Sequence, residues 1–329
     1  MTLPPAPFFQ DITGAPEGGR GFWLTTADDV RIRIGHWRAE GRSGGKARGT
    51  FLIFPGRTEF VEKYGIFAAE LNAAGYDAIA IDWRGQGLAD RLLPDPLVGH
   101  VNTFAEYQND LRAVLAALPQ LDVPAPLFML GHSMGGCIGL RALHEGLPVA
   151  GAVFTGPMWG IRISAPVRPA AWAVSWTSRR LGLSHNYAPS TGADSYVATA
   201  PFEDNLLTRD PEMFAFLKQQ LQAHPELSLG GPSLHWLHEA LLETRALAAL
   251  PAPDVPCVTF VGDNERIVSI RRIRDRMARW PRGRLEVVKD GEHEVLMEDA
   301  ETRARIFAIT CAHFEAAHGI PSDRKAATA

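Results

Sequence analysis

The chain has 329 residues, 46% of them hydrophobic, which is enough to bury a large core as one big domain or as a core with an inserted unit. Its 33 Lys and Arg residues against 37 Asp and Glu residues give a net charge of −4, so no global basic field indicates a nucleic-acid partner. No stretch approaches the length that spans a bilayer, and the first residues lack the basic start and apolar run of a secretory signal. The cysteines are odd in number, as expected for small buried thiols in a reducing compartment, so the sequence predicts a cytoplasmic protein; they are Cys137, Cys257 and Cys311.

The apolar and polar pattern predicts strands and helices that alternate along most of the chain. Strands are expected at residues 22–26, 30–37, 50–54, 78–81, 127–130, 150–155, 257–261 and 285–288. Helices are expected at residues 60–74, 103–118, 137–143, 270–280 and 300–318, the second opening on the capping-box spacing of Thr103 and Glu106. Residues 1–20 are predicted as an irregular arm and residues 42–49 as a loop. The alternation predicts an α/β fold with a mostly parallel central sheet and helices on both faces.

The alternation stops after Pro157 and resumes after Leu250. The residues between show helical patches and no convincing strand, which predicts a helical cap at 157–250 inserted after the sixth core strand. Residues 1–156 and 251–329 then form the core. The insert is either a lid over the active edge of the sheet or an extra layer. Its aromatic residues could form its own small core, and the sequence does not say which tryptophan faces inward among Trp159, Trp172, Trp176 and Trp236.

One short segment carries the strongest chemical signal. Four apolar residues, 127–130, run into Gly131-His132-Ser133-Met134-Gly135, and a helix-compatible segment follows. A sharp turn from a buried strand into a helix strains the serine backbone and exposes its hydroxyl above the sheet. An ordinary Gly/Ser turn can match such a pattern by chance, but the strand before it and the helix after it favour a nucleophile at Ser133.

A serine nucleophile needs a base that contacts it and an acid that orients the base. In a nucleophile elbow the chain order is serine, acid, histidine. Of the histidines after Ser133, only His293 falls in a loop just past a core strand. The loop after the preceding strand offers two carboxylates. Asp263 follows the strand immediately, whereas Glu265 lies two residues further on with a longer side chain, and the residues by themselves leave both open.

These segments together resemble the α/β-hydrolases, and within that fold the lysophospholipase and monoacylglycerol-lipase branch. The resemblance extends from about residue 50 to 300, and its segments are Phe54-Pro55-Gly56-Arg57-Thr58-Glu59 with Tyr64, Asp82-Trp83-Arg84-Gly85-Gln86-Gly87, Gly131-His132-Ser133-Met134-Gly135-Gly136, residues 262–268, and Gly291-Glu292-His293. The family usually has His-Gly where this chain has Pro55-Gly56.

The resemblance implies roles for three more residues. It implies an oxyanion hole formed by the backbone N–H groups of Arg57 and Met134. In the family the acid falls in a Gly-x-x-Asp-x-x-Val frame, and residues 262–268 set Glu265 on that frame. Glu265 is therefore favoured over Asp263 as the acid, although it departs from the usual aspartate; elbow hydrolases accept either.

The predicted chemistry is ester hydrolysis through an acyl-enzyme, with Ser133 as nucleophile, His293 as base and Glu265 as its partner. The resemblance implies a lysophospholipase or monoacylglycerol lipase that acts on a monoacyl lipid or another medium-to-long acyl ester. Alternatives are a short-chain carboxylesterase, thioesterase or acyltransferase of the same fold, and a non-catalytic ligand-binding member. No cofactor or metal is expected, because the sequence has no Cys/His cluster with zinc spacing and no dinucleotide fingerprint. The cap is a candidate for peripheral membrane contact, and the oligomeric state is left open.

Overall fold

The computed structural model describes residues 3–39, 47–164 and 166–318, so most of the loop predicted at 42–49 lies outside the described residues. In the described part, one sheet runs in the order β1-β2-β3-β5-β4-β6-β7-β8-β9. Strands β1 to β3 and the pair β3·β5 are antiparallel, and the remaining pairs are parallel. This confirms the mostly parallel sheet. The strands are β1 (Pro5–Ala6), β2 (Arg20–Thr25), β3 (Arg31–Trp37), β4 (Gly49–Phe54), β5 (Tyr76–Asp82), β6 (Leu127–His132), β7 (Gly151–Thr155), β8 (Cys257–Gly262) and β9 (Gly283–Val288).

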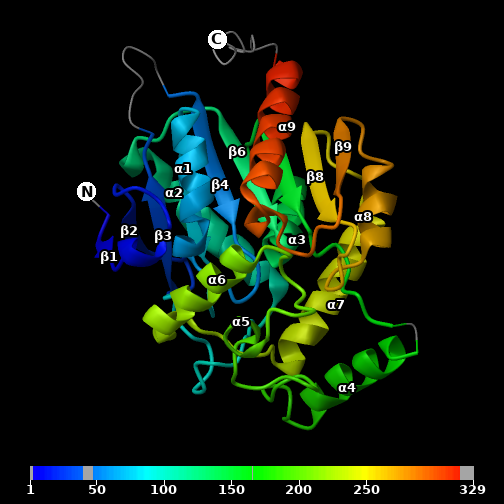
Figure 1. Cartoon of the computed structure of the whole chain (residues 1–329). Helices are drawn as coiled ribbons and strands as arrows, with labels where there is room; N and C mark the ends of the chain where they lie inside the picture. Colours follow the sequence, from blue (N-terminus) through cyan, green and yellow to red (C-terminus); the bar gives the residue numbers. More distant parts are fainter. Residues whose placement is uncertain (1–2, 40–46, 165, 319–329) are drawn as a thin grey trace.

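Helices cover both faces of this sheet (Figure 1). The α-helices of the described residues are α1 (Gly65–Ala73), α2 (Tyr107–Leu121), α3 (Ser133–His144), α4 (Arg168–Arg180), α5 (Tyr196–Thr199), α6 (Pro211–Ala223), α7 (Leu234–Ala249), α8 (Ile270–Met277) and α9 (Ala300–His318). The alternating side chains of β4 show how the two layers form. Phe51 and Ile53 belong to the cluster that includes α1 and α9, whereas Leu52 and Phe54 belong to the cluster of α2, α3 and α8.

Three details of the predicted fold were wrong. The arm at residues 1–20 contains β1, an edge strand that pairs Pro5 with Phe22, so the insert follows the seventh strand of the chain and not the sixth. The helix predicted from Thr103 opens with a 3₁₀ turn, Phe104–Glu106, and Thr103 makes no capping hydrogen bond. The carboxylate of Glu106 accepts hydrogen bonds from Arg84 and Asn102 instead of reaching back to the cap.

The chain between β7 and β8 contains α4 to α7, which gather at one end of the sheet with α4 outermost (Figure 1). Side-chain caps start two of these helices: Asp210 accepts from the N–H groups of Glu212 and Met213, and Ser233 accepts from that of Trp236. Among the described residues, no helix is both long enough and apolar enough to cross a membrane.

Candidate active site

Ser133 lies at the junction between β6 and α3, as the sequence pattern predicts. Its φ of 49° is in the left-handed region, where a residue with a side chain is strained. The flanking glycines make this turn sterically possible. A Cβ on Gly135 would lie 1.9 Å from the carbonyl oxygen of Phe54, and one on Gly131 would lie 3.0 Å from the Cα of Gly136. A larger residue at Gly135 would therefore push the elbow away from β4.

His293 and Glu265 form a buried pair in the loops that follow β9 and β8. Nδ1 of His293 lies 2.6 Å from Oε2 of Glu265. The other carboxylate oxygen of Glu265 accepts hydrogen bonds from the N–H groups of Ile267, at 2.6 Å, and Val268, at 2.9 Å. Burial opposes ionisation of Glu265, but the histidine and these two N–H groups outweigh it and hold the pKa of the carboxyl below its usual value. The pair is thus an ionised carboxylate held in one orientation against an imidazole.

Asp263, the competing carboxylate, lies in a different environment. It is exposed, and its carboxylate accepts no hydrogen bond from any described residue. Because His293 Nδ1 is engaged by Glu265, the ring leaves Nε2 for a serine hydroxyl. No hydrogen bond joins Nε2 to Ser133 Oγ within the described ranges, a contact that in hydrolases often tightens only with substrate.

The loop that carries Arg57 is held from both sides. The indole N–H of Trp83 donates to the carbonyl of Pro55 at 3.1 Å, and the amide of Gln86 donates to that of Gly56 at 2.7 Å. The carboxylate of Glu59 accepts from the Gly56 N–H. The backbone N–H of Arg57 donates to no described residue, and that of Met134 lies in the first turn of α3, where N–H groups lack an intrahelical acceptor. Both donors are therefore available to an oxyanion, despite the Pro55-Gly56 departure from the family pattern.

A cavity of about 420 Å³ joins these parts. Ser133, His293, Arg57 and Met134 all line it. Apolar side chains from the insert form much of its wall, among them Val197, Leu206, Leu207, Leu217 and Leu221. Of the insert tryptophans, only Trp236 lines this cavity in the described chain. Trp159 packs against Phe154 and Trp280 in the core, and Trp176 is 49% exposed.

A cluster of buried charges beneath the site was missed by sequence reasoning. Lys63 forms ion pairs with Glu59 and, at 2.7 Å, with Glu294. Nε2 of His132 lies 3.2 Å from Glu294, and the His132 and His293 rings are 4.9 Å apart. The position of His132 beside Ser133, and of Glu294 beside His293, is the one sequence signal that could have pointed to it.

This cluster ties together the elbow, the Arg57 loop and the His293 loop. Burial disfavours the charged form of His132, but Glu294 and Glu59 outweigh it and raise the pKa of the imidazole. The three side chains Glu59, His132 and Glu294 have a spacing that could suit a metal ion. The ammonium of Lys63 already pairs with both carboxylates, and the raised pKa of His132 favours the imidazolium, which cannot bind a metal, so this donor set does not fit a cation.

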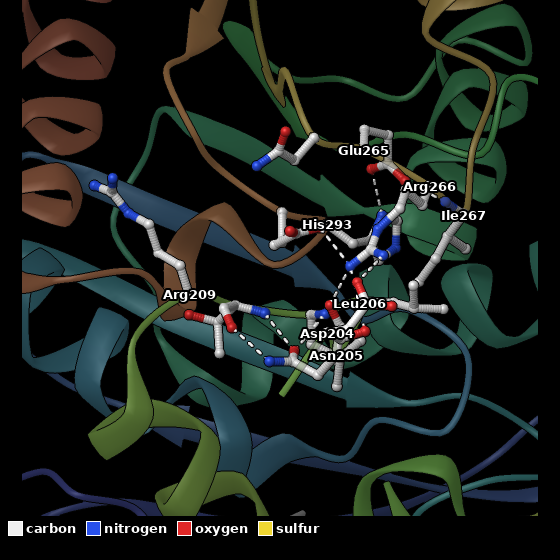
Figure 2. A network of polar contacts seen from close by, with 12 residues as sticks. Asp204, Asn205, Leu206, Arg209, Glu265, Arg266, Ile267 and His293 are labelled. Atoms are coloured by element: carbon white, nitrogen blue, oxygen red, sulfur yellow. Dashed lines mark hydrogen bonds and ion pairs between the residues drawn. The ribbon is translucent and has the colours of Figure 1, made fainter. Parts of the chain in front are cut away.

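A polar network joins the insert to the loops that carry Glu265 and His293 (Figure 2). The guanidinium of Arg266 donates to the Asp204 carboxylate at 2.6 Å and to the Asn205 carbonyl. The backbone N–H of His293 donates to Leu206 at 3.3 Å. The position of the His293 loop therefore depends on the insert as well as on the sheet.

A strained serine between strand and helix, a buried histidine–carboxylate pair and free N–H donors, all at one end of a mostly parallel sheet, are the parts of a serine hydrolase of the α/β-hydrolase class. A family profile described as serine aminopeptidase, S33, matches residues 45–300. The chain belongs to this family, and within the α/β-hydrolases to the lysophospholipase and monoacylglycerol-lipase branch, which confirms the predicted resemblance. It is a carboxylic ester hydrolase.

Relatives and solved structures agree with this placement. The chain is 32% identical over 313 residues to lysophospholipase L2 of Escherichia coli, covering 92% of this chain and 89% of that one. It is 25% identical over 266 residues to a monoacylglycerol lipase of Mycolicibacterium smegmatis, covering 77% of this chain and 86% of that one. A monoglyceride lipase structure from Saccharomyces cerevisiae superposes with a TM-score of 0.71 at 17% identity, covering 95% of this chain and 99% of that one, which supports the fold alone.

Proposed function

We propose that the protein hydrolyses the acyl ester of monoacyl glycerolipids. The observation that carries this proposal is that Ser133 and His293, the latter paired with buried Glu265, open into a cavity walled by leucines of the insert. An apolar wall stabilises a hydrocarbon chain by about 0.8 kcal/mol for each buried CH₂. A binding protein without activity would gain nothing from an ionised carboxylate held against His293.

The mechanism follows from the same positions. Nε2 of His293 takes the proton of Ser133 as the oxygen attacks the ester carbonyl, and Glu265 stabilises the imidazolium. The N–H groups of Arg57 and Met134 hold the negative oxygen of the tetrahedral intermediate. His293 then protonates the leaving glycerol oxygen. In the second half it activates the water that releases the fatty acid and regenerates the serine.

The proposal is tested by turnover of an ester series that varies acyl length and head group, with the Ser133→Ala variant as the blank. We expect medium-to-long acyl glycerol esters to be cleaved faster than acetyl esters. A fluorophosphonate probe should label the wild-type protein and not Ser133→Ala. An unlabelled wild-type protein would contradict the assignment of an activated serine.

We propose that residues 157–250 act as a cap that supplies the acyl site. Leu206 is half-buried and lines the cavity, and its segment is held by the Arg266 network (Figure 2). Replacing Leu206 with serine should lower kcat/KM for long-chain esters about tenfold more than for acetyl esters, because apolar contact with the chain is lost.

The matched control is Leu242→Ser, a leucine of α7 that is 40% exposed and does not line the cavity. Its ratio of kcat/KM for long-chain esters over acetyl esters should equal that of the wild-type protein. Equal losses for both esters in Leu206→Ser would mean that the insert only packs on the core.

We further propose that α4 rests on an anionic membrane surface. Its polarity is reversed for a helix in water: the buried side chains are Ser175 and Ser178, whereas Val174 and Trp176 are exposed. Exposed Val167, Leu181 and Leu183 flank it. Residues 157–193 hold four arginines and no acidic residue, although the whole chain is net negative. Apolar side chains among arginines are typical of helices that lie in the membrane interface.

The double variant Trp176→Ser/Leu181→Ser should bind vesicles of phosphatidylglycerol and phosphatidylcholine at least about tenfold more weakly than the wild type, because the apolar area that enters the interface is lost. Sedimentation with the vesicles measures this, and Leu242→Ser serves again as control. Failure of the wild-type protein to sediment with the vesicles would refute the proposal. The cytoplasmic location also stays a prediction; Cys137 and Cys257 are buried free thiols.

A further inference from the structure

The side chain of Arg57 is a cation in the active-site cavity that has no anionic partner in the described part of the chain. Four basic side chains among the described residues line this cavity. Lys63 is paired with Glu59 and Glu294, His132 lies against Glu294, and His293 is held by Glu265. Arg57 forms no ion pair with any described residue; its one side-chain hydrogen bond runs from Nη1 to the carbonyl of Gly230, at 2.8 Å.

Other enclosed arginines among the described residues satisfy their guanidinium groups in one of two ways. Arg33 is bound by Glu62 and Asp82, and Arg84 is bound by Asp28 and Asp110. Two carboxylates thus offset the cost of enclosing each of those guanidinium groups. Arg276, which forms no ion pair with a described residue either, donates instead to the carbonyls of Leu247, Leu250 and Pro251. Within the described ranges Arg57 has neither two carboxylates nor such a set of carbonyls.

The surroundings of Arg57 confine its guanidinium without neutralising it. The group lies 5.7 Å from the ring centroid of Trp236, and an added Cβ on Gly99 would meet Nη1 at 3.2 Å. Burial lowers the pKa of Arg57 to about 10, so the side chain still carries its charge at neutral pH. A permanent positive charge with free N–H donors therefore faces the cavity that holds Ser133.

We propose that the Arg57 side chain binds the phosphodiester of a lysophospholipid head group, which makes phosphate-bearing monoacyl lipids the preferred substrates over neutral monoacylglycerols. This inference rests on the proposed ester hydrolysis. The guanidinium fork matches phosphate oxygens, and the bond is strengthened because both partners are charged and shielded from water.

The placement of Arg57 in the chain gives this assignment its geometry. Its backbone N–H is the donor proposed for the ester oxyanion, and in a lysophospholipid the phosphate is joined to that ester through the glycerol backbone. One residue therefore contacts the reacting carbonyl through its main chain and reaches toward the head group through its side chain. The side chain contacts the 230–236 segment, whereas the leucines assigned to the acyl chain come from residues 206–221.

The test compares two substrates that share the 1-oleoylglycerol unit and differ in the phosphoglycerol head group: 1-oleoyl lysophosphatidylglycerol and 1-monooleoylglycerol, both below their critical micelle concentrations. In Arg57→Met the ratio of kcat/KM for the first over the second should fall roughly 10- to 100-fold, as expected for the loss of charge-assisted hydrogen bonds. The ratio for Arg57→Lys should lie between those of the wild type and Arg57→Met, because lysine keeps the charge but loses the paired N–H donors of the guanidinium. The matched control is Arg282→Met, an exposed arginine bound to Asp254, whose ratio should equal that of the wild type.

Two measurements separate head-group binding from a structural tie between core and insert. sn-Glycerol 3-phosphate should inhibit turnover of monooleoylglycerol by the wild type and lose most of that effect in Arg57→Met. If the role of Arg57 is purely structural, Arg57→Met should lower kcat/KM for both substrates equally and should also lower the melting temperature. That result, or an unchanged ratio of kcat/KM, would overturn the inference.

Failure of the proposed function is a different outcome. If the wild type hydrolyses neither lipid, the ester-hydrolase proposal fails first, and calorimetric binding of the two lipids then decides the role of Arg57. Tighter binding of the lysophospholipid that is lost in Arg57→Met supports the inference. Equal binding of both lipids refutes it.

Discussion

Replacing Ser133 with alanine is expected to lower kcat on a monoacyl ester by about a millionfold, because loss of the nucleophile in a triad leaves only binding and the oxyanion hole. The variant should stay folded. Ser133 opens into the cavity and is not part of either large core cluster, and alanine meets the same left-handed backbone with a similarly small side chain. The melting temperature should change by no more than a few degrees.

Turnover assays of purified Ser133→Ala, with thermal unfolding on the same sample, check this expectation. Ser164→Ala, an exposed serine of the insert, is the control and should keep wild-type activity. Near-normal turnover by a folded Ser133→Ala protein would end the nucleophile assignment. His293→Ala should be about as severe, and full activity in that variant would place the base elsewhere.

The second large effect is expected at Glu265, where the change to glutamine should cost around 10⁴ in kcat. Glutamine keeps the shape of the side chain but removes the charge that stabilises the imidazolium of His293. The two backbone N–H groups that bind Oε1 in the native protein could still be satisfied by the amide oxygen, so the loop should hold. The expected defect is therefore chemical and not structural.

Asp263→Asn is the matched comparison for Glu265→Gln, since both variants replace a carboxylate of the same loop with its amide. Asp263 is exposed and its carboxylate contacts no described partner, so its variant should turn over at close to the wild-type rate. A crippled Asp263→Asn beside a near-normal Glu265→Gln would reverse the assignment of the acid. Single-turnover kinetics on both proteins, prepared separately, would show which one fails in acylation.

Much of the fold follows from local sequence pattern. Most of the parallel strands are buried on both faces, so they are continuous apolar runs, and the segments between them show the helical spacing of apolar residues. The elbow around Ser133 is local as well, because strand, glycines, serine and helix are contiguous. Strand β1 was missed because two residues that pair with β2 carry no periodic pattern of their own.

The candidate site also has parts that local sequence predicted and parts that it left open. Ser133 and His293 were named from the sequence, since each follows a predicted strand and parallel strands end at one edge of the sheet. The residues alone did not separate Asp263 from Glu265. In the structure Glu265 is enclosed and lies 2.6 Å from His293, while Asp263 points to solvent, a difference made by the path of the loop and not by either residue.

By itself, the sequence determined the fold class, and it predicted the order of the proposed nucleophile, acid and base and the place of the helical insert, because each depends on residues close together in the chain. Only the tertiary structure decided which charges are compensated. Lys63 forms an ion pair with Glu294 although more than two hundred residues separate them, Arg57 forms no ion pair within the described residues, and α4 exposes Trp176 while burying Ser175. Those outcomes depend on how distant loops pack against one another. The free energy of pairing or burying such groups is set by tertiary contacts, which leave no periodic pattern in the sequence.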